Sequence, residues 1–404
     1  MSAIKSVLTN ASLFRKVYLI TLFLCQISFV QIATFQLAPF LFVWGMAITG
    51  YNIVIKGSFY RLRHGMWIFG FVACGLGTAV FYIMDNFAEN IFMAMHVVLC
   101  CFVFYGLHTE KPSQHKGEAY FVCKFIVIAT SVAAALGIAF LFLGVEYELF
   151  WVKIAIFENR FTGIYSNPNL LGFSAAVALV CCHMCLKKDF VKTSGATRLS
   201  RIWIFVCAAL NAISLFLCDS RGALLLVICY MAFSLVFLIF EQSKKVGRKR
   251  IFGQAVALAL AGAFIITAFF FTSYLCKTGF SAILAARSSE VGTVIVSDSG
   301  EVVAPQVPTF GHEAGQTLDN GRLDLLRNAA QLFLLNPFFG IGQGNIVDFA
   351  QKLLSDPTLA DNIHFNDLHN GYMTILVSTG VLGFAVFSIF GLRFAKEIFI
   401  IILK

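Results

Sequence analysis

The sequence predicts an all-α polytopic membrane protein, a bundle of about 10–12 transmembrane helices with one large extracytoplasmic loop. Of its 404 residues, 59% are hydrophobic and 13% are charged, whereas soluble domains carry about 25% charged residues. Apolar runs long enough to cross a hydrocarbon core of about 30 Å recur along the chain. Basic residues collect in alternate loops between these runs.

We expect nine spans before residue 276, at 17–35, 37–55, 66–84, 88–107, 119–144, 168–186, 202–217, 221–240 and 251–275. A tenth is expected within 371–390, and 398–403 either extend it or begin another span. The chain therefore divides into a bundle at 1–275, a large loop at 276–370 and a C-terminal transmembrane segment at 371–404.

The charges in the loops give an orientation, because cytoplasmic loops carry an excess of Lys and Arg. Five alternate loops are basic, and they contain Lys56, Arg61, Arg63, Lys111, Lys116, Lys187, Lys188, Lys192, Arg198, Arg201, Lys244, Lys245, Arg248, Lys249, Arg250, Arg393 and Lys396. The intervening loops, including the large one, are then expected outside the cytoplasm. This placement explains the net charge of +9 without nucleic-acid binding.

The large loop contains one helical pattern. Residues 276–320 include Pro305 and Pro308 and are predicted to be irregular. From Arg322 onward, apolar residues recur at helical spacing until Asn336-Pro337, which predicts an amphipathic helix lying over the bundle. The glycine-rich run that follows lacks the Lys-Ser/Thr ending of a phosphate loop, so we expect a turn joining two surface helices.

Two arginines are predicted at helix starts on the outer side. Arg221 opens a span, where its guanidinium could bind a diphosphate through two hydrogen bonds, or could instead reach the interface or pair with Asp219. Arg322 opens the amphipathic helix, where a cation opposes the helix dipole, which is a hint of function against an ordinary exposed arginine.

A third arginine lies just before the span at 168–186. Arg160 precedes Asn167-Pro168-Asn169, and either asparagine can cap that helix, with Pro168 in its first turn. The cap is the structural interpretation. An outward helix N-terminus beside an arginine also suits an anion.

One histidine lies where the large loop returns to the membrane. His369, followed by Asn370 and Tyr372, has a side chain suited to accept a proton near neutral pH, although most single histidines are structural or merely exposed. His312 and His364 share the loop without metal-ligand spacing to carboxylates, so we expect no metal site.

Together these motifs resemble those of the O-antigen ligase and polysaccharide polymerase family of membrane glycosyltransferases. The resemblance covers about residues 160–383 and rests on motifs in a fixed order: Arg160-Phe161-Thr162-Gly163, Asn167-Pro168-Asn169 with Gly172, Ser220-Arg221, Gly321-Arg322, Asn336-Pro337 with Gly340, Gly342 and Gly344, and His369-Asn370 with Tyr372 and Gly380. Members usually have about a dozen spans, whereas this sequence ends soon after the tenth, and 276–320 match none of the family motifs.

The resemblance implies a GT-C-like enzyme in the bacterial inner membrane, which moves a glycan from an undecaprenyl diphosphate carrier to a saccharide or lipid-linked saccharide at the outer face. It implies His369 as the base and Arg221 and Arg322 as diphosphate clamps, with Arg160, Asn167, Asn169, Asn370 and Tyr372 in substrate binding. No metal ion or nucleotide cofactor is implied.

A transporter or flippase of lipid-linked oligosaccharides is the alternative. Such a protein places charged residues in mid-membrane and shows related halves, whereas here the candidate charges lie at expected helix ends and no halves are evident.

Overall fold

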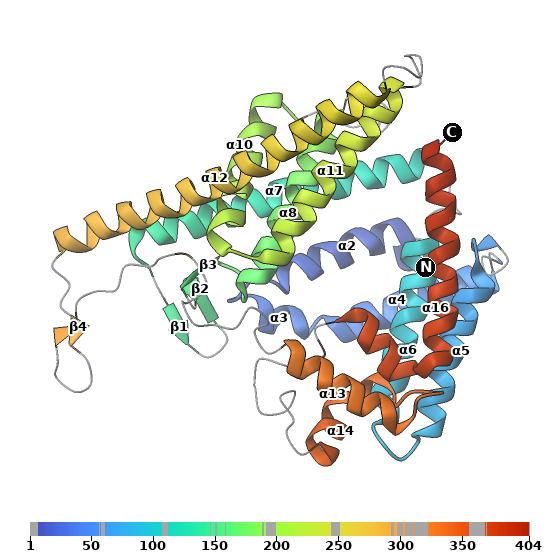
Figure 1. The fold of residues 1–404 in the computed structure, drawn as a ribbon. Helices are drawn as coiled ribbons and strands as arrows, with labels where there is room; N and C mark the ends of the chain where they lie inside the picture. The colour runs from blue at the N-terminus through green and yellow to red at the C-terminus, as the bar shows by residue number, and fades with distance from the viewer. Residues whose placement is uncertain are drawn as a thin grey trace. The chain divides into compact units, whose positions relative to one another are not determined.

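The computed structural model describes residues 7–55, 57, 61–106, 112–145, 147–149, 152–157, 159–187, 190, 199–243, 251–291, 295–296, 302–303, 310, 322–354, 368 and 370–403. Its helices are α2 Ala11–Leu24, α3 Gln31–Phe35, α4 Ala38–Val54, α5 Gly65–Phe81, α6 Phe87–Leu99, η2 Cys100–Phe104, α7 Pro112–Leu143, α8 Pro168–Leu186, α10 Arg201–Cys218, α11 Arg221–Ser243, α12 Ile251–Val291, α13 Arg322–Leu335, η5 Gln343–Asn345, α14 Ile346–Leu353 and α16 Gly371–Leu403 (Figure 1).

Within these residues, eight helices are long and apolar enough to cross a membrane, and the apolar helix Gly65–Phe81 is shorter. Many of their large side chains are exposed, such as Phe40 at 73% and Phe264 at 74%. Exposed apolar area on this scale is unfavourable in water and normal in lipid. The predicted all-α membrane fold is therefore confirmed.

The prediction of one continuous helix at 17–35 is wrong. α2 ends at Leu24, and α3 begins only at Gln31. In between, the chain pairs with the segment before α8: the Ser28 N–H donates to the Ile164 carbonyl at 2.9 Å, and the Ser166 N–H donates to the Gln26 carbonyl at 3.0 Å. These bonds replace those of a continuous helix, so the break is not left with unpaired backbone groups.

Two further boundaries differ from expectation. The helix expected to end at residue 275 continues as α12 to Val291, so the first part of the expected large loop is helical. At the C-terminus, α16 runs from Gly371 to Leu403 with a kink at Gly380, so residues 398–403 continue the tenth expected span.

A small antiparallel sheet, β1-β2-β3, precedes α8 where a loop was expected. Its strands are Tyr147–Leu149, Val152–Phe157 and Arg160–Gly163, and the short strands Ile295–Val296 and Val302–Val303 form a second sheet. The sequence of β2, VKIAIF, does favour a strand, because it is rich in β-branched and aromatic residues.

The chain forms two compact units. Unit 1 comprises 1–18, 38–112 and 315–404, and unit 2 comprises 19–37 and 113–314. In unit 1, α16 packs against α5 and α13. In unit 2, α8 packs against α10, α11 and β3, around a hydrophobic core that includes Phe161, Leu171 and Leu217.

Candidate functional site

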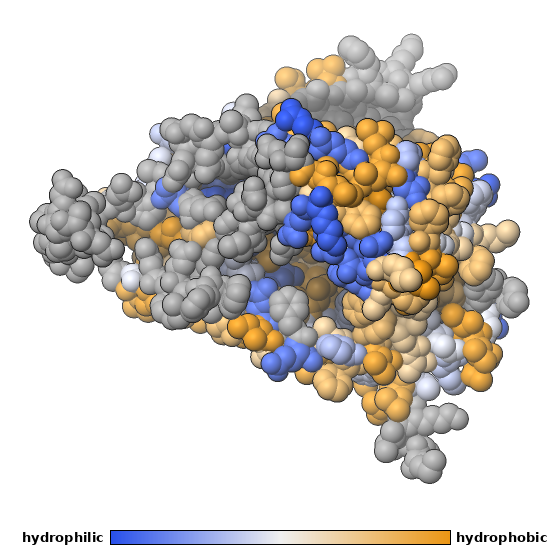
Figure 2. All heavy atoms as spheres, turned by 90° about the horizontal axis from the view of Figure 1, so that it is seen from below, coloured by the Kyte–Doolittle hydropathy of each residue, from blue (hydrophilic) through white to orange (hydrophobic). Residues whose placement is uncertain are grey.

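The expected amphipathic helix of the large loop is present as α13. It begins at Arg322 and ends at Leu335, and its buried residues Leu325, Ala329 and Leu332 contribute to a core of unit 1. Arg322 lies on the exposed side of the first turn. Figure 2 looks onto the face that carries α13 and α14, where hydrophilic and hydrophobic side chains border each other. The guanidinium is therefore accessible to an anion from outside the helix.

The glycine-rich segment after α13 docks into a break in α16. Gly380 has a φ of 65° and a ψ of −172°, which interrupts the helix. Four backbone hydrogen bonds join the segment to the two sides of the break: Ile341 N–H to Val377 O at 2.9 Å, Gly342 N–H to Ser378 O at 3.0 Å, Val381 N–H to Pro337 O at 2.8 Å, and Leu382 N–H to Phe338 O at 3.3 Å. The segment thereby pairs the backbone groups that the break releases, so these groups are not left without hydrogen-bond partners.

Asparagines of the α6 start hold the other end of this segment. The Gly344 N–H donates to Oδ1 of Asn90 at 2.8 Å, and Nδ2 of Asn86 donates to the carbonyl of Gly344 at 3.3 Å. Nδ2 of Asn86 also donates to the Asp348 carboxylate at 2.9 Å. This hydrogen bond, helped by Lys352 at 3.6 Å, lowers the pKa of Asp348 below its usual value.

The residues around His369 are positioned by the start of α16. Oδ1 of Asn370 accepts hydrogen bonds from the N–H groups of Tyr372 at 3.1 Å and Met373 at 3.3 Å, which is a helix cap. Tyr372 is 67% exposed. His369 itself lies outside the described residues. The cap fixes the backbone that follows it.

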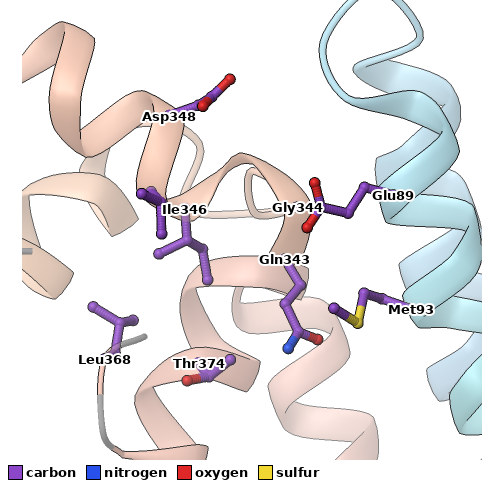
Figure 3. A pocket seen from close by; sticks show the side chains of 9 residues that line it. Glu89, Met93, Gln343, Gly344, Ile346, Asp348, Leu368 and Thr374 are labelled. Atoms are coloured by element: carbon purple, nitrogen blue, oxygen red, sulfur yellow. The ribbon is translucent and has the colours of Figure 1, made fainter. Parts of the chain in front are cut away.

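A cavity of about 200 Å³ lies in unit 1 between the start of α6, the η5–α14 segment and the start of α16 (Figure 3). It is lined by Glu89, Met93, Gln343, Gly344, Ile346, Val347, Asp348, Leu368 and Thr374. Leu368 is the residue before His369 in the sequence. The cavity therefore adjoins the chain segment that carries the expected base.

In unit 2, the Arg160 side chain is a structural connection. It is 8% exposed, and its Nε donates to the Cys218 carbonyl at the end of α10 at 2.8 Å. One of its Nη atoms donates to Oδ1 of Asn169 at 2.8 Å. Arg160 thus links β3, the end of α10 and the start of α8.

The N-terminus of α8 is built as the sequence indicated. Oδ1 of Asn167 accepts from the Asn169 N–H at 2.7 Å, and Pro168 occupies the first turn. Gly172 lets α8 approach the connection between α10 and α11 closely, since a Cβ there would lie 2.6 Å from the Cβ of Ser220. The expected capping interpretation of Asn167 is confirmed.

Arg221 is exposed at the first turn of α11. Just before it, Asp219 ends α10 with a φ of 49° and accepts a hydrogen bond from Nζ of Lys277 on α12 at 2.5 Å. From the sequence, Lys277 was expected in the large loop at 276–370 and was not singled out, whereas the structure places it inside α12. It brings a further cation to the connection that carries Arg221.

The sequence candidates fall into two groups. Arg160, Asn167, Asn169 and Arg221 belong to unit 2, with Arg160 on β3, the two asparagines at the start of α8, and Arg221 at the start of α11. Arg322, Asn370 and Tyr372 belong to unit 1, at the starts of α13 and α16. Among the described residues, no group of three or more His, Cys, Asp or Glu side chains is arranged to hold a metal ion.

Part of the chain matches the profile of a known protein family. The O-antigen ligase family profile matches residues 205–388. This segment is therefore similar to the O-antigen ligase family. No curated protein and no solved structure matches it. Similarity to the O-antigen ligase family supports a membrane enzyme of glycosyl transfer that acts on lipid-linked saccharides.

The O-antigen ligase match contains Arg221, Arg322 and His369, whereas Arg160 lies before it. It also contains the whole glycine-rich segment and the Gly380 break that receives it. Glu89 and Gln343, which line the cavity, were missed from the sequence. Nothing in the local sequence marks Glu89 as a neighbour of a segment some 250 residues later.

Proposed function

We propose that this protein transfers a glycan from a polyprenyl diphosphate carrier, undecaprenyl diphosphate in bacteria, to a saccharide acceptor at the outer face of the bacterial inner membrane. The supporting observation is that the family match includes His369 and two arginines, Arg221 and Arg322, that are exposed at first turns of helices. Exposed guanidinium groups suit a diphosphate, because they form paired, charge-assisted hydrogen bonds with it.

The chemistry needs a leaving group, a base and charge stabilisation. His369 accepts the proton of the acceptor hydroxyl, and that oxygen forms a bond to the anomeric carbon of the donor glycan. The bond between this carbon and the diphosphate oxygen breaks, and the polyprenyl diphosphate leaves with the electron pair. Arg221 and Arg322 stabilise the charge that develops on the leaving diphosphate.

The test is a transfer assay with the full-length protein in proteoliposomes, a lipid-linked oligosaccharide donor and a saccharide acceptor. We expect His369→Ala to lower kcat by about 10²–10⁴-fold. Arg221→Gln and Arg322→Gln should each lower it by about 10²–10³-fold. The matched control is Arg327→Gln, since Arg327 lies on the same helix as Arg322 with its side chain 75% exposed.

Two acceptors separate the forms of the reaction. Transfer onto a lipid-linked core saccharide indicates a ligase, and growth of a ladder on the lipid-linked oligosaccharide indicates a polymerase. Wild-type rates of transfer by His369→Ala would refute the assignment of the base. An absence of transfer to either acceptor by the wild-type protein would refute the proposed function.

A further inference from the structure

The 200 Å³ cavity of unit 1 has the wrong charge for a diphosphate. Glu89 and Asp348 both line it, and among the described residues no Lys or Arg does. A phosphate group placed there would meet the negative charge of Glu89, which no cation of the described part of the chain offsets. A ligand with neutral hydroxyl groups has no such penalty.

The two carboxylates of the cavity differ in their partners. Asp348 is held by Asn86 at 2.9 Å and Lys352 at 3.6 Å, and Figure 3 shows its carboxylate directed away from Gln343 and Thr374. Glu89 has no hydrogen-bond or ion-pair partner within the described part of the chain. Glu89 is therefore the carboxylate with lone pairs to offer a ligand.

The other polar groups extend this pattern. Oγ1 of Thr374 donates its proton to the Asn370 carbonyl at 3.1 Å, so it presents lone pairs to the cavity. Gln343 supplies one amide with both donors and an acceptor. The cavity thus offers mainly hydrogen-bond acceptors, and its best ligand is one that carries several O–H donors.

The rest of the wall is apolar. Met93, Ile346, Val347 and Leu368 line the cavity beside these polar groups. A pyranose combines both surfaces, because its hydroxyl groups lie at the rim and its C–H groups form the faces of the ring. Binding sites for small molecules have this composition of apolar walls with few polar groups. At 200 Å³, the cavity is smaller than the roughly 300–1,000 Å³ of pockets for drug-sized ligands, which suits one ring.

We propose that this cavity binds a neutral sugar ring of the acceptor, with Glu89, Gln343 and Thr374 accepting its hydroxyl protons. The assignment to the acceptor, as opposed to any other sugar, rests on the proposed function. The position of the cavity supports this assignment. Leu368 lines the cavity, Thr374 on its wall donates to the Asn370 carbonyl, and Leu368 and Asn370 flank His369 in the sequence. Glu89 is a binding residue here and takes no part in the proton transfer.

The test uses two probes with the same ring: methyl α-glucopyranoside, which is neutral, and methyl α-glucopyranosiduronic acid, which carries a carboxylate. Binding to the full-length protein in detergent is measured by saturation-transfer NMR. We expect the wild-type protein to bind the neutral glycoside at least about fivefold more tightly than the uronate. Glu89→Gln should weaken binding of the neutral glycoside by about tenfold and strengthen binding of the uronate. General damage to the fold does not produce opposite effects on the two probes.

Gln343→Leu is the second variant. It should weaken binding of both probes by about fivefold, because it removes an amide that can form hydrogen bonds with either ligand. The matched control is Asp85→Asn. It removes a negative charge from the connection just before α6, the helix that carries Glu89, but Asp85 does not line the cavity. The Asp85→Asn variant should therefore bind both probes as tightly as the wild type does. Neutral-glycoside binding that is absent in the wild type, or unchanged by Glu89→Gln and Gln343→Leu, overturns the inference.

The transfer assay separates this inference from the proposed function. If both hold, Glu89→Gln raises the acceptor KM by about tenfold and leaves the donor KM unchanged, whereas Arg221→Gln changes the donor KM. If transfer occurs with an unchanged acceptor KM in Glu89→Gln, the function stands and the acceptor site is refuted. If the wild type transfers nothing but binds the neutral glycoside through Glu89, the sugar site stands and the function is refuted.

Discussion

The backbones of Gly340 and Gly380 are in direct contact. A Cβ placed on Gly340 would lie 2.5 Å from the nitrogen of Gly380, and a Cβ placed on Gly380 would lie 2.6 Å from the nitrogen of Gly340. Both residues have positive φ, 73° and 65°. The contact fastens the glycine-rich segment to the break in α16, and the segment in turn forms one wall of the cavity.

Gly380→Ala tests this contact. With φ near 65° and ψ near −172°, Gly380 lies in a region open almost only to glycine, where another residue costs about 1–3 kcal/mol, and the added methyl group also meets the backbone of Phe338. We expect a loss of about 3 kcal/mol in the free energy of unfolding, measured by thermal unfolding in detergent.

The control for this prediction is Gly391→Ala on the same helix, where the exposed glycine has nothing within 4 Å of an added Cβ. A helical alanine there should leave stability unchanged or raise it by about 0.5–1 kcal/mol. Equal effects of the two substitutions would contradict the role of the contact.

Arg160→Met tests the structural connection in unit 2. The substitution leaves the Cys218 carbonyl and Oδ1 of Asn169 without the guanidinium that pairs them. We expect a loss of about 2 kcal/mol in stability, because buried acceptors without partners cost about 1–3 kcal/mol. Thermal unfolding of Arg201→Met, which removes an exposed arginine from the same unit, should match that of the wild type. A stable Arg160→Met protein with a raised donor KM would instead assign Arg160 to direct substrate binding.

The Lys277–Asp219 pair should be stronger than an ordinary surface pair. Its side chains are only 21% and 18% exposed, whereas those of Arg327 and Asp324 are 75% and 51% exposed. Double-mutant cycles with Asp219→Asn and Lys277→Met should give a coupling of about 1 kcal/mol, against at most about 0.5 kcal/mol for Asp324→Asn and Arg327→Gln. Similar couplings in the two cycles would show that burial does not strengthen the first pair.

The hydrogen bond from Asn86 to Asp348 predicts a dependence on pH. Since it lowers the pKa of Asp348, its contribution to stability is complete above the unfolded pKa and is lost as pH falls through the folded pKa. Asn86→Gly removes the donor and tolerates the φ of 46° at this position. We expect the wild type to be more stable than this variant at pH 7, with the difference shrinking as the pH falls below about 4. A difference that does not change with pH would disprove this linkage.

Helices with local end signals were predicted well from the sequence. α8 begins at Pro168, with Asn167 as its cap, as expected, and α10 begins at Arg201, one residue before the expected start at 202. α13 likewise begins at Arg322 and ends before Asn336-Pro337. Capping groups act within one turn of the residue that carries them, so their effect is visible in a short stretch of sequence.

Features made by distant contacts were not visible in this way. Residues 25–30 carry no proline or glycine, and the helix breaks there because the chain pairs with residues 164–166. The glycine-rich run was expected only as a turn, because the break at Gly380 that receives it lies about 40 residues away. The cavity has the same origin: Glu89 and Gln343 become neighbours only when the segment docks.

The length of α12 has a mechanical consequence. Its 41 residues give a rod of about 60 Å, twice the hydrocarbon thickness of about 30 Å. The helix contains no proline, and it carries Lys277, the partner of Asp219, beyond its midpoint. Because no proline interrupts it, α12 is expected to tilt as one rigid rod. A tilt at Lys277, which contacts the connection before Arg221, therefore also moves residue 251 at the other end of the helix.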